Sequence, residues 1–366
     1  MEHSIDCSGK RILIIKPSSL GDIVHTLPLV HALKRCFPDC SIGWIVQQAF
    51  VPLLEENDSI DAVYPIHIPS TSEPQASRLS WLQALQATVG VLNNLRQQFR
   101  RQPYDLILDL HASFRSGLLG QTNPGGIRIG FRDARELNTF FQNILITVPV
   151  AVQHAQEKNL LFCNLLGCPV REEDFYLSTG REARREADAF LGEQGIREYR
   201  KIVYANAAAR WQSKFWPVEH WASLADSLYK IGIIMVFCGS PQDSRYVESI
   251  GKLMRTPLIS ATGRLSLLGA AALLQRSALY IGLDSGPMHM AALARIPVVA
   301  LFGPTHPARV GPHGTVHRIV RAEHLDCLEC RKRSCSHRSC MREISVQMVY
   351  DAAETLLQQR PVREST

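Results

Sequence analysis

Long apolar runs are missing from this chain of 366 residues. No stretch approaches the roughly 18–20 apolar residues that span a bilayer, and the best candidates, 231–237 and 296–302, have the length of buried strands. The N-terminus also lacks a basic region followed by an apolar segment and a cleavage site, so we expect no signal peptide. These absences argue against a membrane-spanning or secreted protein and favour reduced thiols in a cytoplasm.

Neither sign of charge dominates the sequence. Lys and Arg number 40 and Asp and Glu 34, so the net charge is +6. This excess suits an anionic ligand or a membrane surface, and we expect no nucleic-acid partner. Hydrophobic residues at 46% and charged residues at 20% are ordinary for a globular protein and exclude a disordered or collagen-like chain. The length is about twice that of a usual single domain.

Short β-rich runs alternate with helical patterns along the chain, which predicts parallel sheets covered by helices. Residues 11–16 (RILIIK) are typical of a strand buried on both faces, and helices are expected over 22–36 and 77–101. The further strands are expected at 41–46, 62–66, 105–110, 125–130, 201–205, 231–237, 258–260, 278–282 and 298–302.

The alternation weakens at 169–180 and then starts again. We therefore expect an α/β protein of two Rossmann-like domains, 1–175 and 185–345, followed by a C-terminal helix and tail at 346–366 that can belong to either half. Two such domains would face a central cleft at the carboxyl ends of their strands, where α/β sheets bind ligands.

The segment KPSSLGDIVHTLP, residues 16–28, leads from a strand through a turn at Gly21 into a helix expected to begin at Asp22. Backbone N–H groups gather at such a helix start. Asp22 can act there as a general base, or it can only cap the helix. The loop matches neither G-x-G-x-x-G nor the P-loop pattern, so neither a dinucleotide nor a P-loop site is supported.

Two segments of the second half can hold an anion. Lys214 lies just before an expected helix start, where a lysine suits a phosphate; a solvated lysine is the alternative. In the segment 279–307, Ser285 can cap a helix and Gly286 lets a ligand approach the backbone. His289 either points into the same site or is hydrogen-bonded under the turn.

Basic and sulfur-containing residues form two further groups. Arg115, Arg128, Arg132 and Arg135 can form a wall for an acidic acceptor, or an ordinary solvated surface. The cysteines Cys327, Cys330, Cys335 and Cys340 can bind zinc, but only the first pair has a usual spacing, so free or paired thiols are the alternative. The chain has no D-x-D motif, and we expect no catalytic metal.

Together these segments resemble glycosyltransferase family 9, the heptosyltransferases of lipopolysaccharide core assembly, from about residue 11 to 345. The matching residues are Ser18, Ser19, Leu20, Gly21 and Asp22 with His25 and Pro28; Lys214 with Trp216 and Pro217; Asp284, Ser285, Gly286, Pro287, Met288 and His289 with Ala291 and Ala292; and Phe302, Gly303, Pro304 and Thr305. The helical segment 154–167 is also similar to one in the family.

The resemblance implies a GT-B fold, with the acceptor site in the first domain and the donor site in the second. It implies ADP-L-glycero-β-D-manno-heptose as donor and an inverting, metal-independent transfer without a cofactor. Asp22 would be the general base. The donor-binding residues expected are Lys214, Asp284, Ser285, Gly286 and His289. For the acceptor we expect Ser19 and Gly21, together with Arg115 and Arg132 of the basic wall.

Some positions depart from the family pattern, such as Ala209 and Arg210, where some heptosyltransferases I have hydroxyl residues. The acceptor, Kdo-lipid A or a heptosyl saccharide, is therefore left open. Because such acceptors are anionic and lipid-linked, we expect a cytoplasmic protein in peripheral contact with the inner face of the cytoplasmic membrane. The alternatives are another GT-B enzyme, either a different hexosyltransferase or an epimerase, and a non-catalytic sugar-nucleotide-binding protein.

Overall fold

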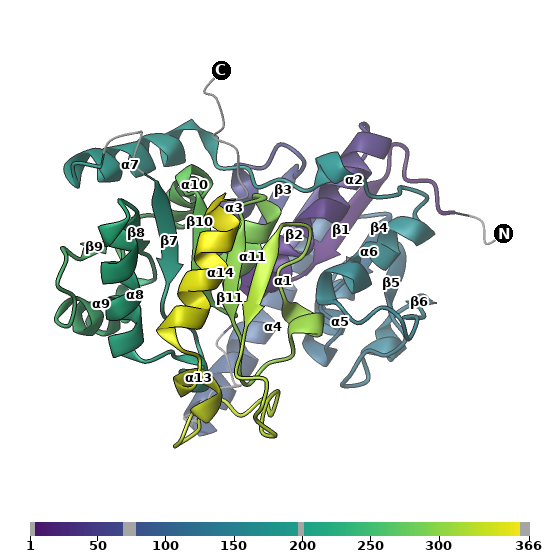
Figure 1. Cartoon of the computed structure of the whole chain (residues 1–366). Coiled ribbons are helices and arrows are strands. Elements are labelled where there is room, and N and C mark those ends of the chain that lie inside the picture. The colour runs from purple at the N-terminus through teal and green to yellow at the C-terminus, as the bar shows by residue number, and fades with distance from the viewer. Residues whose placement is uncertain (1–3, 69–77, 197–200, 359–366) are drawn as a thin grey trace. The chain divides into compact units, whose positions relative to one another are not determined.

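The computed structural model describes residues 4–68, 78–196 and 201–358. The chain forms two compact units, Met1–Phe175 and Tyr176–Thr366. Each unit contains a six-stranded sheet, with the orders β3-β2-β1-β4-β5-β6 and β12-β11-β10-β7-β8-β9 (Figure 1). Numbered within its own unit, each sheet has the order 3-2-1-4-5-6 of a Rossmann domain. The predicted α/β class is confirmed.

In the first unit the strands are short and parallel. They are β1 (Arg11–Ile15), β2 (Ser41–Gln47), β3 (Ala62–Ile66), β4 (Leu106–Asp109), β5 (Ile127–Phe131) and β6 (Ile144–Ile146). The helices are α1 (Leu20–Val24), α2 (Leu27–Cys36), α3 (Val51–Glu55), α4 (Arg78–Arg101), α5 (Phe114–Gly120) and α6 (Ala155–Leu165), with the 3-10 turns η1 (Gln48–Phe50), η2 (Asn138–Phe141) and η3 (Glu172–Asp174).

An aromatic cluster fills the core of the first unit beside β2 and β3. The rings of Tyr64, Phe99 and Tyr104 meet edge to face, and the two tyrosine hydroxyls are 2.7 Å apart. Gly43 of β2 makes room for them, because a Cβ atom there would collide with the Tyr104 ring. Burial of one such aromatic side chain stabilises the fold by roughly 1.5–3 kcal/mol.

The second unit repeats this plan. Its strands are β7 (Ile202–Asn206), β8 (Ile234–Phe237), β9 (Ile259–Ser260), β10 (Leu279–Leu283), β11 (Val298–Leu301) and β12 (His317–Val320). Its helices are α7 (Gly180–Glu193), α8 (Val218–Lys230), α9 (Ser244–Gly251), α10 (Leu267–Arg276), α11 (Gly286–Leu293), α12 (Pro307–Val310), α13 (Ser339–Arg342) and α14 (Val346–Gln358), with the 3-10 turns η4 (Gln212–Lys214) and η5 (Pro241–Asp243).

The C-terminal helix α14 packs on the second sheet beside α8 (Figure 1). Val349 and Ala353 lie in the same buried cluster as Trp216 and Trp221. The Trp216 indole N–H also donates to the carbonyl of Ile344, 2.9 Å away, just before α14 begins. The helix that the sequence left unassigned is therefore part of the second unit.

The structure differs from the sequence-based expectations at two kinds of place. The helix expected over 22–36 is broken into α1 and α2, because Pro28 has no N–H to donate to the carbonyl of Val24. The strands β6 and β12 were not expected. Each lies at the edge of its sheet and has three or four residues, which is too short for a periodic pattern to stand out.

A buried ion pair fastens the end of the first unit to α2. The Asp174 carboxylate accepts hydrogen bonds from Nε and Nη2 of Arg35, both at 2.9 Å, and from the Arg171 N–H at 2.7 Å. The His31 ring lies 2.7 Å from the Asp174 carbonyl. Burial lowers the pKa of His31 to about 4, despite the raising effect of Asp174. The last turn before the unit boundary is thus held by charge as well as by packing.

We predict that Asp174→Ala lowers the free energy of unfolding by about 3 kcal/mol, because it removes the buried carboxylate of the Arg35 pair and leaves only the exposed Glu173 beside the guanidinium. Urea titration followed by circular dichroism measures the effect. Asp133→Ala is the matched control: Asp133 pairs with Lys158 at the surface of the same unit, so its loss should cost less than about 1 kcal/mol. Equal effects of the two changes would contradict the prediction.

Candidate active site

The strand order concentrates the connecting loops at one point of each sheet. In the first unit β1 and β4 are neighbours, with Ile15 opposite Asp109, and their chains leave in opposite directions. In the second unit β7 and β10 are related in the same way, with Asn206 opposite Gly282. Doubly wound sheets bind ligands at such switch points, outside the carboxyl ends of the strands.

Asp22 lies in the turn that follows β1. Its Oδ2 accepts hydrogen bonds from the N–H of Ser19 at 2.9 Å and from the Ser19 hydroxyl at 2.8 Å. Helix α1 begins at Leu20, with Gly21 buried in its first turn, so it starts two residues before the predicted position. Ser19 is the N-cap, and Asp22 completes a capping box from the third helical position. One carboxylate oxygen therefore caps the helix and leaves the other for a second partner.

That second partner is Lys16, which the sequence analysis took only as the end of a strand. Its Nζ lies 3.5 Å from Oδ1 of Asp22 and donates to the carbonyl of Leu110 at 2.8 Å. The Lys16 side chain is 9% exposed, whereas that of Asp22 is 42% exposed. A lysine that ends a buried strand needs a counter-charge, and this was the signal in the sequence.

The largest influences on the pKa of Asp22 oppose each other. Burial would raise the pKa, but the charge of Lys16 and the hydrogen bonds from Ser19 lower it further than burial raises it. The net effect is a pKa well below the ordinary value for an aspartate. Burial and the nearby Lys16 also lower the pKa of His111, which follows β4. This edge of the sheet thus carries an ionised carboxylate beside a neutral imidazole at neutral pH.

The arginines expected to line an acceptor site divide into two groups. Arg115 lies in α5 and Arg132 directly after β5, so both are at the carboxyl side of the first sheet, as Asp22 is. Nε of Arg132 donates to the Thr147 hydroxyl at 3.1 Å. Arg128 differs, because it lies within β5 and its Nε donates to the Phe141 carbonyl at 2.9 Å. Arg128 therefore helps to hold the fold.

A buried carboxylate that the sequence analysis did not single out, Asp109, organises the loops around these arginines. Its side chain is almost fully buried at the end of β4. It accepts hydrogen bonds at 2.7–3.1 Å from two backbone N–H groups and three side chains. The donors are the N–H groups of His111 and Ala112 and the side chains of Ser116, Asn138 and Gln142.

In the second unit, Lys214 and Asp284 form a buried ion pair. Nζ of Lys214 lies 2.7 Å from Oδ2 of Asp284 and 2.8 Å from its carbonyl oxygen. Their side chains are 13% and 8% exposed. The same Nζ is 4.8 Å from the centre of the Trp211 ring, a cation–π contact. The alternative that Lys214 is a solvated loop residue is therefore wrong.

Ser285 lies beside this pair. The sequence offered it as a side-chain cap of α11, but its side chain makes no capping hydrogen bond. Its backbone is extended, and its hydroxyl donates to Oδ1 of Asn206 at 2.7 Å. Gly286 begins the helix, and His289 is buried within it. Gly282 has no room for a Cβ atom, which would lie 2.9 Å from the Asn206 carbonyl. β7 and β10 are thereby joined at their carboxyl ends.

The cysteine-rich segment packs beside η4, which carries Lys214, and beside the turn after β11. The sequence did not indicate these contacts. The Ser213 N–H donates to the Arg333 carbonyl at 3.3 Å, and the Arg333 guanidinium lies 5.6 Å from the centre of the Trp211 ring. The N–H groups of Glu329 and Arg331 bond to the carbonyls of the turn after β11. Trp211 and Arg333 are thus neighbours of the Lys214–Asp284 pair.

The four clustered cysteines are free thiols. Cys327 and Cys330 are exposed, whereas Cys340 is buried. Burial, with the neighbouring cysteines, raises the pKa of Cys340 to about 11. Within residues 4–68, 78–196 and 201–358, no three His, Cys, Asp or Glu side chains are arranged to hold a metal ion.

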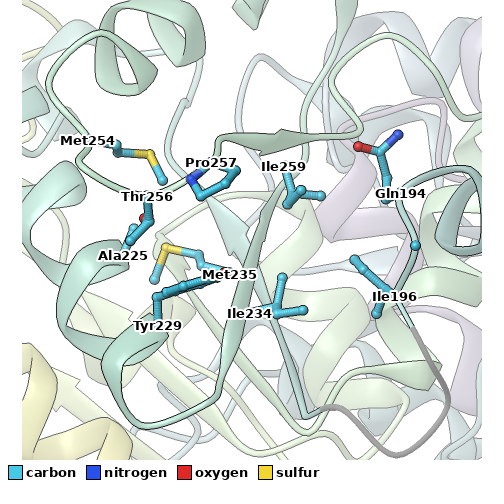
Figure 2. Close-up of a pocket in the computed structure, with 11 residues that line it drawn as sticks. Gln194, Ile196, Ala225, Tyr229, Ile234, Met235, Met254, Thr256, Pro257 and Ile259 are labelled. Carbon is cyan, nitrogen blue, oxygen red and sulfur yellow. The ribbon is translucent and has the colours of Figure 1, made fainter.

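A separate pocket lies at the amino end of β8 in the second sheet, away from the carboxyl ends of the strands (Figure 2). Ile234 and Met235 line it from the amino end of β8, together with Tyr229 of α8. Its lining contains no charged side chain. A phosphorylated ligand needs cations or helix N-termini, so this pocket does not compete with the Lys214–Asp284 region as an anion site.

A comparison with protein-family models shows which family contains this arrangement. The family model described as glycosyltransferase family 9 (heptosyltransferase) matches residues 92–341. The chain belongs to glycosyltransferase family 9. It is therefore a glycosyltransferase, and the resemblance found in the sequence is confirmed.

Curated members of family 9 match most of the chain. Lipopolysaccharide heptosyltransferase 1 of Pseudomonas aeruginosa is 27% identical over 89% of this chain and 88% of its own length. Lipopolysaccharide heptosyltransferase 3 of Escherichia coli is 28% identical over 78% of this chain and 80% of its own length. Lipooligosaccharide heptosyltransferase 2 of Haemophilus influenzae is 24% identical over 94% of this chain and 99% of its own length. The three types are thus about equally similar to this chain.

Solved structures of family 9 members share the fold. A Veillonella parvula member has a TM-score of 0.82 and 24% identity, covering 98% of this chain and 99% of that one. The Escherichia coli heptosyltransferase WaaC with ADP has a TM-score of 0.70 and 22% identity, covering 94% and 99%. The fold is GT-B, as the resemblance implied.

We predict that Lys16→Met raises the pKa of Asp22, because it removes the neighbouring positive charge while keeping a similar side-chain volume. The Asp22 carboxyl carbon, assigned by its loss from the NMR spectrum of Asp22→Asn, should stay ionised to lower pH in the wild type than in the variant. Lys34→Met is the control, since Lys34 also bonds a carbonyl and an aspartate of this unit. An unchanged titration in Lys16→Met would refute the prediction.

Proposed function

We propose that this protein transfers a heptose from ADP-L-glycero-β-D-manno-heptose to the lipopolysaccharide inner core, with inversion and without a metal ion. The observation that carries the proposal is the Lys–Asp pair at the switch point of each unit of a family 9 fold. The pair of the first unit provides an ionised carboxylate, and the pair of the second provides a cation for a diphosphate. The relative crystallised with ADP supports the choice of nucleotide.

In this proposal Asp22 is the general base. Oδ2 of Asp22 accepts the hydrogen bonds from Ser19, so Oδ1 is the oxygen that takes the proton, and the partly exposed side chain can reach an acceptor hydroxyl. As the acceptor oxygen bonds to the anomeric carbon, its proton passes to Asp22 and the bond to ADP breaks. Direct displacement inverts the anomeric centre without a covalent intermediate. The low pKa of Asp22 ensures that the base is ionised at neutral pH.

Lys214 and the first amides of α11 stabilise the departing diphosphate. A lysine, the amides of Ser285 and Gly286 and the helix dipole supply positive charge where negative charge develops, which is the role that a metal ion has in other transferases. Lys214 is held by Asp284. Asp284 then both positions the ammonium group and accepts hydrogen bonds from donor-sugar hydroxyls, and His289 contributes to the donor site from α11, the helix that follows this turn.

The acceptor is proposed as a class, either Kdo-lipid A or a heptosyl saccharide. Identities of 27%, 28% and 24% to heptosyltransferases 1, 3 and 2 do not select one type. Over the described parts of the chain, no helix has the length and apolar character to cross a membrane. We also propose peripheral attachment at the cytoplasmic face, where a lipid-linked acceptor is accessible.

The proposal is tested by incubating the protein with ADP-heptose and each acceptor and identifying the product by mass spectrometry and anomeric NMR, with EDTA present. We expect transfer to one acceptor class. Asp22→Asn should reduce turnover by about 10²–10⁴, since it removes the general base, while calorimetry shows unchanged ADP binding.

Asp133→Asn serves as the control, since it changes a surface carboxylate of the same unit, and it should keep full turnover. Near-normal turnover of Asp22→Asn would restrict Asp22 to helix capping. ADP-heptose left unconverted by the wild type with every acceptor would overturn the proposed donor and favour a transferase that uses another sugar nucleotide.

We predict that Lys214→Met weakens ADP binding by roughly ten- to a hundredfold, because a charge-assisted contact to phosphate is worth about 1.5–3 kcal/mol. Calorimetry measures the dissociation constant. Lys230→Met, at the exposed end of α8, should leave it unchanged. ADP affinity that is equal in both variants would show that Lys214 only balances the charge of Asp284.

A further inference from the structure

The first unit exposes a group of large apolar side chains on the turn around η2 and at the start of α5. Leu137 is 65% exposed and Phe140 80% exposed, and both belong to the turn around η2. Phe114 at the start of α5 is also exposed, and its ring lies 5.4 Å from that of Phe141 in an edge-to-face contact. We call Phe114, Leu137 and Phe140 the η2 patch. Grouped apolar side chains on a surface mark an interaction site more often than scattered ones do.

A buried network holds the η2 patch in its exposed position. Asn138, between the two exposed residues, is fully buried. Its side chain donates to Oδ2 of Asp109 at 2.7 Å and to the Ser113 carbonyl at 2.6 Å. Leu137 has a φ of +60°, which is uncommon for a bulky residue. The loop thus turns Asn138 inward and Leu137 and Phe140 outward on a fixed support.

The surroundings of the η2 patch are positively charged. Arg115, Arg132 and Arg135 are close to it along the chain. Of the two nearby acids, Asp133 pairs with Lys158 at 2.8 Å, and Glu136, whose carboxylate accepts the Phe114 N–H at 3.2 Å, is outnumbered by the three arginines. Apolar side chains with a cationic rim suit the headgroup and acyl boundary of an anionic bilayer. Three side chains are a small area for a stable protein interface.

The η2 patch also lies on the functional side of its unit. Asp109, which holds Asn138, ends the strand next to β1, opposite Ile15. The turn with Asp22 follows β1 at the same edge of the sheet. We propose that the η2 patch is a membrane anchor, which inserts Leu137 and Phe140 into an anionic bilayer and presents the Asp22 edge to lipid-linked acceptors. The purpose of this anchor, though not its existence, rests on the proposed function.

The first experiment measures co-sedimentation of the full chain with vesicles of three parts phosphatidylcholine and one part phosphatidylglycerol, without donor or acceptor. The double variant Leu137→Ser/Phe140→Ser should bind at least about tenfold more weakly, since each apolar side chain contributes by burial. The wild type should keep part of its binding at high salt, because burial of apolar surface is not screened as charge is. Leu253→Ser, an exposed leucine of the second unit, should bind as the wild type does.

The second experiment reports insertion directly. Phe140→Trp should show a blue-shifted emission on these vesicles and quenching by brominated acyl chains. Vesicle binding of the double variant equal to that of the wild type, or a tryptophan that bromine does not quench, would overturn the proposal. So would a wild-type dimer in analytical ultracentrifugation that the double variant abolishes, because the patch would then bind a second copy.

A third measurement separates this inference from the proposed function. On a deacylated, water-soluble acceptor the double variant should turn over as fast as the wild type, whereas on acceptor embedded in vesicles its KM should rise by about tenfold or more. If the wild type transfers nothing, the proposed function fails while the vesicle results still decide the anchor. A double variant that is equally impaired on both acceptors would overturn the anchor and assign the patch to saccharide binding.

Discussion

A buried lysine must be neutralised, and both units meet this constraint with an aspartate at the switch point. Lys16 is held by a carbonyl and by Asp22, and Lys214 by the carboxylate and carbonyl of Asp284. The pairs differ in one respect: the Asp22 carboxylate is open to solvent, whereas both members of the second pair are enclosed. An open carboxylate can exchange a proton with a ligand, while an enclosed ammonium group keeps a fixed position for an anion.

Helix capping and the proposed catalysis are compatible at Asp22 because the two carboxylate oxygens have different partners. Oδ2 bonds to Ser19 and fixes the rotation of the side chain, and Oδ1 faces Lys16. The capping role that the sequence set against the base is thus a means of orienting it. Asp284 differs, because its carboxylate and its carbonyl both accept hydrogen bonds from one ammonium group, that of Lys214.

The sequence predicted much of the fold and the neighbourhood of both pairs, because a continuous apolar strand such as 11–16 and the turn at Asp284 are local signals. It missed Lys16, although the need of a buried lysine for a counter-charge pointed to the nearby Asp22. It missed Asp109 and Arg333 because each acts through a partner distant in sequence, Asn138 and the turn at Ser213, respectively. Periodicity and spacing report local structure, and such contacts exist only once the strands are ordered. The sequence also did not predict that Phe140 is exposed, because a large aromatic residue is usually buried.

The two units present different surfaces at their strand ends, and the chemistry of the proposed substrates accounts for the difference. A nucleotide sugar is small and highly charged, so it needs a cation held without solvent, as Lys214 is between Asp284 and Trp211. A lipid-linked saccharide brings a surface that no pocket can enclose. The first unit, which is proposed to bind this acceptor, therefore has to contact the membrane surface, with arginines for phosphate groups and rigid apolar side chains for acyl chains. Asp109 makes this arrangement possible, because one buried carboxylate fixes both the loop after β4 and the turn that carries Phe140.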